Sequence, residues 1–67
     1  GEAPMMTFEE AVEVMKEFGG GLLLDGLEVV RDELDRARED EDYIIEISKE
    51  ERMAYFIVVE RMRPLFA

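Results

Sequence analysis

Apolar side chains recur at helical spacing along the middle of the chain, with charged side chains between them. The apolar positions alternate in steps of four and three residues and are Leu23, Leu27, Val30, Leu34 and Ala37. This spacing places one apolar stripe along one face of a helix. The pattern predicts a helix over about residues 25–39, with Asp25 as its N-cap.

A second periodic stretch begins at the sequence Thr7-Phe8-Glu9-Glu10. Threonine followed three residues later by glutamate is typical of a capping box, in which each side chain accepts a hydrogen bond from the other residue's backbone amide. Apolar positions continue at helical spacing to Phe18, and three glycines follow at residues 19–21. Because glycine commonly ends helices, these signals predict a helix over about 7–18.

The C-terminal third carries a second capping box, Ser48-Lys49-Glu50-Glu51, and a proline at residue 64. Together they predict a helix over about 49–63. The segment 43–47 is rich in β-branched and aromatic residues, a composition that allows a short strand. The fold predicted is mainly α, a small three-helix domain. The alternative is an α+β fold with two helices and a hairpin that pairs 43–47 with 53–60.

The domain organisation follows from length. Sixty-seven residues make one domain at most. We expect residues 1–5 to be a disordered tail or a remnant of an expression vector, and residues 6–67 to form the single small domain.

One segment, residues 53–59, has the sequence MAYFIVV and contains no polar side chain apart from the tyrosine hydroxyl. On a helix these side chains spread past half of the circumference, and two other helices of about a dozen residues leave part of them uncovered. We therefore expect a partner, either a second copy or another protein. The alternative is a central core helix covered by Leu22–Leu24 and Leu65–Phe66. The candidate apolar binding residues are Tyr55, Phe56, Val58, Val59 and Met62.

The charge is strongly negative, with thirteen Glu and five Asp against six Arg and two Lys, a formal net charge of -10. Such a surface repels nucleic acids and anionic membranes and attracts basic protein surfaces. No apolar stretch is long enough to span a bilayer, and Glu2 stands where a signal peptide carries a basic residue. We expect a soluble cytoplasmic protein that does not bind nucleic acid directly. The candidate acidic binding residues are Asp32, Asp35, Glu39, Asp40, Glu41 and Asp42.

Catalytic groups are scarce. The chain has no histidine and no cysteine, and the hydroxyls of Thr7 and Ser48 are assigned to caps. The glycines at 19–21 lack the following Lys and Ser or Thr of a phosphate-binding loop. The acidic run 39–42 lacks the glycine of an EF-hand calcium loop. We expect no enzymatic activity and no cofactor, and we give divalent-metal binding by the acidic run a low weight.

These observations favour a small acidic protein-interaction module that binds and blocks a basic surface of a partner protein. An antitoxin, a phage-encoded inhibitor or a mimic of a nucleic-acid duplex has this character. The segment Met6–Ala11 looks like the start of many short phage-encoded reading frames, although any capped amphipathic helix uses the same residues. The alternative is a structural homodimerisation module with no inhibitory role.

Overall fold

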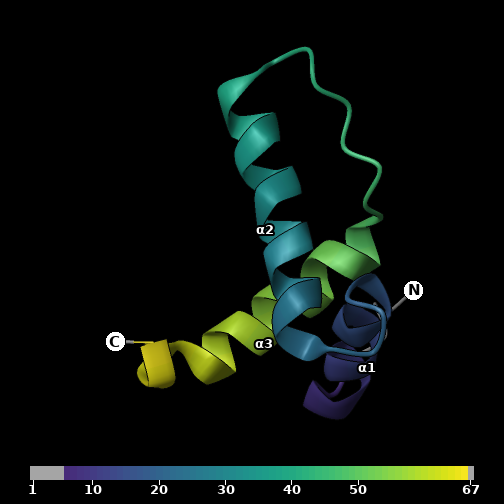
Figure 1. Ribbon diagram of the computed structural model, residues 1–67, viewed down its shortest axis with the longest axis vertical. Helices are drawn as coiled ribbons and strands as arrows, with labels where there is room; N and C mark the ends of the chain where they lie inside the picture. The colour runs from purple at the N-terminus through teal and green to yellow at the C-terminus, as the bar shows by residue number, and fades with distance from the viewer. Residues whose placement is uncertain (1–5, 67) are drawn as a thin grey trace, which may run out of the picture.

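The computed structural model describes residues 6–66, and it describes side chains as far as Pro64. Within that range the chain forms three helices, α1 (Phe8–Phe18), α2 (Leu23–Glu39) and α3 (Lys49–Phe66), and no strand (Figure 1). The prediction of a mainly α three-helix domain is confirmed, and the alternative with a hairpin is wrong. Residues 1–5, the predicted tail, and Ala67 lie outside the described residues.

Both predicted capping boxes are present. At the start of α1 the amide of Glu10 donates to Thr7 Oγ1 at 3.1 Å, and the amide of Thr7 donates to Glu10 Oε1 at 3.2 Å. At the start of α3 the amide of Glu51 donates to Ser48 Oγ at 3.1 Å, and the amide of Ser48 donates to Glu51 Oε1 at 2.8 Å. These bonds satisfy amides that the helix itself leaves without acceptors.

The ends of α2 and α3 differ from the sequence prediction. Residue Leu22 occupies the N-cap of α2 with no side-chain capping bond, so the assignment of Asp25 as the cap is wrong. The helix starts earlier because the glycine turn leads directly into it, and the amide of Gly26 donates to the Leu22 carbonyl at 3.0 Å. At the other end, α3 continues through Pro64 to Phe66.

The glycine turn ends α1 with a Schellman motif. The amide of Gly21 donates to the Lys16 carbonyl at 2.8 Å, and that of Gly20 donates to the Glu17 carbonyl at 3.5 Å. This pattern needs a residue in the left-handed region, and Gly20 has φ 65°. The motif reverses the chain within a few residues, and α2 therefore packs against α1.

The central element is α1, which packs against both other helices, whereas α2 and α3 touch each other much less. In Figure 1, α2 and α3 diverge from a common region beside α1. The radius of gyration is 12.3 Å, above the roughly 11 Å expected for a compact domain of this length. All three helices and the segment before α3 contribute to the core, whose buried residues are Ala11, Met15, Leu27, Val30, Ile47, Ala54 and Val58.

The loop before α3 lies along the part of α2 that the shorter α1 does not reach. The 17 residues of α2 span about 25 Å and the 11 residues of α1 about 16 Å, so α1 cannot cover the C-terminal part of α2. The loop runs back along that part of α2 (Figure 1). Its residues alternate, with Ile45 half-buried, Ile47 buried and Ile44 81% exposed. The segment 43–47 therefore has the alternation of a strand but pairs with no other strand in residues 6–66.

A close backbone contact between α1 and α2 lies at Gly26, which is buried inside α2. A Cβ atom at this position would overlap the Met15 carbonyl oxygen and lie 2.8 Å from the Met15 carbonyl carbon. The backbones of α1 and α2 therefore meet at a distance that only glycine permits. Sequence periodicity did not single out Gly26, although a glycine inside a helical pattern often has a packing reason.

We predict that Gly26→Ala lowers the free energy of unfolding by about 1–2 kcal/mol. Helix propensity alone favours alanine by about 1 kcal/mol. The overlapped Met15 atoms belong to the backbone, so the forced separation of α1 from α2 costs about 2–3 kcal/mol, the upper part of the usual overpacking range. Urea unfolding followed by circular dichroism measures the difference. The control Glu28→Ala, at an exposed position of the same helix, should change stability by less than about 0.5 kcal/mol. A stabilised Gly26→Ala variant would show that the close contact is absent.

Candidate functional site: an apolar groove and an acidic helix face

The apolar side chains of residues 53–59 point in three directions. Ala54 and Val58 are 0% exposed and belong to the core, so Val58 does not lie on the surface of the monomer. Tyr55 and Val59 are half-buried and face α2. Phe56 is 58% exposed. The protein's own helices therefore cover more of this segment than the sequence predicted, and Phe56 alone among the seven is mostly exposed.

The alternative prediction was that Leu22–Leu24 and Leu65–Phe66 cover the apolar residues of α3. Within Leu22–Leu24, Leu23 is half-buried and packs against the core, whereas Leu22 and Leu24 are 62% and 61% exposed and give little cover. The side chains of Leu65 and Phe66 lie outside the described ones. The cover comes from α1, because its Ala11 and Met15 lie in the core with Ala54 and Val58. Met62, another predicted binding residue, is half-buried and packs against this core.

A groove lies where α2 and α3 diverge, and we call it the α2–α3 groove. Its volume is about 280 Å³. Its lining residues come from both helices and are Leu24, Leu27, Glu28, Arg31, Tyr55 and Val59. The groove joins two of the predicted apolar residues, Tyr55 and Val59, to an α2 surface that sequence reasoning did not assign to a site. The exposed Leu24, off the apolar stripe of α2, was the signal that could have indicated it.

The charges beside the groove act on the Tyr55 hydroxyl. Burial raises the pKa of Tyr55 above its ordinary value, and the carboxylate of Asp35 raises the pKa further, while the guanidinium of Arg31 lowers it. Tyr55 lines the groove together with Glu28 and Arg31 of α2. The groove combines an apolar lining with a charged rim.

The solvent-facing side of α2 carries a continuous row of carboxylates, which we call the acidic stripe. Its members are Asp25, Glu28, Asp32, Asp35 and Glu39, and all are exposed. Steps of three and four residues place them on one face of the helix, nearly opposite the apolar stripe. Three of them, Asp32, Asp35 and Glu39, were predicted. Asp25 was missed because it was assigned to a capping role that the helix does not use, and Glu28 was not assigned to a site.

The predicted residues Asp40, Glu41 and Asp42 lie beyond the stripe, in the turn after α2, and all three are exposed. Asp40 organises this turn, since its Oδ1 accepts from the Asp42 amide at 2.9 Å and its carbonyl accepts from the Tyr43 amide at 3.1 Å. In the described part of the chain, no three acidic side chains group in a way that could hold a metal ion. The acidic run therefore gives the metal-binding alternative no geometric support.

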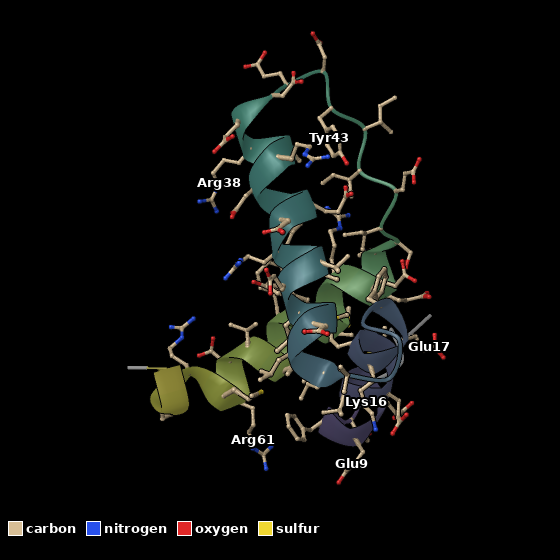
Figure 2. The ribbon with its side chains drawn as sticks, viewed as in Figure 1. Glu9, Lys16, Glu17, Arg38, Tyr43 and Arg61 are labelled. Carbon is tan, nitrogen blue, oxygen red and sulfur yellow. The ribbon has the colours of Figure 1, made fainter. Side chains whose placement is uncertain are left out.

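The turn is tied to α2 through Tyr43. Its hydroxyl donates to Glu33 Oε2 at 2.6 Å, and the Arg36 guanidinium lies 5.5 Å from the ring centroid. Figure 2 shows Tyr43 between the loop and α2. The hydrogen bond to Glu33 is the main cause that raises the pKa of Tyr43. These contacts hold the acidic turn next to the end of the acidic stripe.

Charge is divided unevenly among the elements. Four of the seven charged residues of α3 are basic, whereas six of the nine in α2 and four of the five in α1 are acidic. The loop between α2 and α3 carries four acids and no base. Some bases of α3 also make structural contacts, since the Arg61 guanidinium lies 5.0 Å from the Phe8 ring centroid (Figure 2). The negative charge therefore lies mainly on α1, α2 and the loop.

The charged side chains of the described residues lie at the surface. Among the side chains that the structure describes, no polar or charged one is buried. Three ion pairs are present in the same range, Lys16–Glu13, Arg31–Asp32 and Arg63–Glu60, and all are exposed. Most carboxylates of the acidic stripe are therefore free to meet cations of another molecule.

Comparison with protein-family models, with curated proteins and with solved structures finds no match to this chain. Within residues 6–66, no helix has the length and apolar content needed to cross a membrane.

We predict that both tyrosines titrate above the ordinary pKa of about 10 in the native protein. Tyrosinate absorbance measures this, with Tyr43→Phe leaving Tyr55 as the single reporter. A tyrosine whose pKa is higher in the native than in the unfolded protein stabilises the native state. This stabilisation is fully present below a pH of about 10 and is lost as the pH rises through the native pKa. Adding Asp35→Asn should lower the pKa of Tyr55. An unchanged pKa in that variant would place the hydroxyl away from α2.

Proposed function

We propose that this protein is a small acidic interaction module that binds and blocks a basic surface of a partner protein. The acidic stripe of α2 carries the proposal. Its five exposed carboxylates form one face of a helix whose opposite face is held in the core. Basic residues of a partner can meet this face without any rearrangement of the module, and complementary charge speeds and orients such encounters.

The spacing of the stripe favours a protein surface over duplex mimicry as its recognition mode. Five carboxylates over about 21 Å give one charge per roughly 5 Å, whereas duplex DNA carries one charge per about 1.7 Å of axis. The stripe therefore reproduces about a third of the duplex charge density. An antitoxin or a phage-encoded inhibitor that covers a basic protein surface requires only the lower density.

Two triple variants of equal charge test this proposal. The α2 variant combines Asp25→Asn, Asp32→Asn and Asp35→Asn. The α1 variant combines Glu9→Gln, Glu13→Gln and Glu17→Gln. Each removes three charges, one of them from a first helical turn and one from an ion pair, and all six residues are exposed. The α1 variant therefore controls for net charge and for helix stability.

The immobilised protein is exposed to a bacterial extract at low and at moderate salt, and each retained protein is purified and its affinity measured. We predict basic partners whose binding is weakened about tenfold or more by the α2 variant and less by the α1 variant, since charges in contact outweigh distant ones. If both variants weaken binding equally, the net charge of the protein drives binding and the acidic stripe has no special role. Retention of no basic protein at either salt would refute the proposal.

A second candidate function is homodimerisation through the exposed side of α3. Phe56 is 58% exposed and forms an edge-to-face pair with Tyr55 at a centroid distance of 5.3 Å. A shallow hollow beside it is lined by Phe8, Ile57, Glu60 and Arg61. Because α3 carries slightly more bases than acids, two copies can approach there without bringing their acidic faces together.

For this second function we predict a mass twice the 7.8 kDa of one chain in sedimentation at micromolar concentration, and a return to monomer in Phe56→Glu. A buried glutamate without a partner opposes the dimer, whereas an exposed one does not affect the helix. The control Leu22→Glu adds the same charge at a similarly exposed position outside α3 and should stay dimeric. A wild-type monomer would eliminate the homodimer.

A further inference from the structure

We propose that the α2–α3 groove is the anchor site for a basic amphipathic helix of the partner protein. This inference rests on the proposed function, and it adds where the partner's apolar side chains bind. The groove provides the lining of Leu24, Leu27, Tyr55 and Val59, with Glu28 and Arg31 beside it. The acidic stripe runs along the same helix and supplies the charges that flank the groove.

The volume of the groove decides between a small molecule and a protein side chain. Small-molecule sites enclose about 300–1,000 Å³ and bury most of their ligand. The α2–α3 groove has a volume of about 280 Å³, near the lower end of this range, and it is open to solvent, so a small molecule bound there would stay largely exposed. It can accept one or two apolar side chains that project from a helix, as in recognition of helices by grooves.

The charge around the groove selects the partner. Glu28 lines the groove, and Asp32 and Asp35 follow it on the acidic stripe. The cation at the groove, Arg31, lies 3.6 Å from Asp32 Oδ1, and this carboxylate offsets part of its charge. Lysine and arginine residues that flank an apolar anchor therefore meet unpaired carboxylates on α2. A second copy of this chain would bring another molecule with a net charge of -10 to the same face.

Leu24 and Leu22 provide a matched pair of variants. Both are leucines about 60% exposed, so replacement by alanine changes the surface and not the core. Leu24 lines the groove, and Leu22 is not among its lining residues. Any difference in ligand affinity between Leu24→Ala and Leu22→Ala therefore reports on the groove.

Two synthetic helical peptides serve as probes. The first has lysines along its sides and leucines at positions i, i+4 and i+7, and the second has alanine in place of each leucine at the same charge. Binding by the protein, by Leu24→Ala, by Leu22→Ala and by the α2 triple variant is measured by fluorescence anisotropy. This design forms a double-mutant cycle between Leu24 and the peptide leucines.

We expect the leucine peptide to bind about tenfold more tightly than the alanine peptide, and Leu24→Ala to remove most of that difference. Leu22→Ala should leave both affinities unchanged, and the α2 triple variant should weaken both peptides. In the nuclear magnetic resonance spectrum, the leucine peptide should shift the Tyr55 ring and Val59 methyl signals and leave the Leu22 methyl signals in place.

Three results would overturn the inference. If the α2 triple variant weakens both peptides but Leu24→Ala and the peptide leucines show no coupling, the groove is not the anchor site and the acidic stripe alone binds. If the α2 triple variant binds both peptides as tightly as the wild-type protein does, the proposed function fails as well. If the chain alone is a dimer that Leu24→Ala dissociates, the groove is occupied by a second copy.

Discussion

The close backbone contact between Gly26 and the Met15 carbonyl sets how α1 and α2 pack together, and the rest of the domain is built on that pair. It brings the backbones of α1 and α2 together at the point where α2 begins, directly after the Schellman turn. Since α1 also packs against α3, both longer helices are fixed to the shortest one. They diverge from a common region beside it (Figure 1), and residues of both line the α2–α3 groove.

The short α1 also explains how the acidic surface is organised. An apolar stripe of 17-residue α2 extends past the end of α1, and the loop before α3 covers the remainder through Tyr43, Ile45 and Ile47. The loop thereby holds the acids of the turn beside those of the helix. The carboxylates face water because the core occupies the other side of α2. One packing constraint therefore produces both the groove and the adjoining acidic stripe.

Features that depend on local sequence were predictable, and features that depend on contacts between helices were not. Thr7 and Ser48 each carry their capping partner three residues away, so both helix starts could be predicted. The segment 43–47 alternates like a strand, but a strand also needs a partner, which a local pattern cannot reveal. The direction of Val58 and the role of Gly26 depend on where α1 lies. Likewise, Tyr55 and Val59 become groove residues only when Leu24 and Glu28 of α2 lie opposite them.

Both sides of the groove are positioned by their packing against α1. Closing it would require α2 to tilt toward α3, but α2 is held at Gly26 by backbone contact with α1. On the other side, α3 is held by the buried Ala54 and Val58 and by the contact of Arg61 with Phe8. An apolar groove kept open in this way exposes Leu24 to water in the free protein. Its geometry is then already formed before a ligand arrives, and binding loses less conformational entropy than it would at a surface that had to rearrange. This packing leaves apolar area unburied in a domain of marginal stability, which favours a role in which another molecule covers that area.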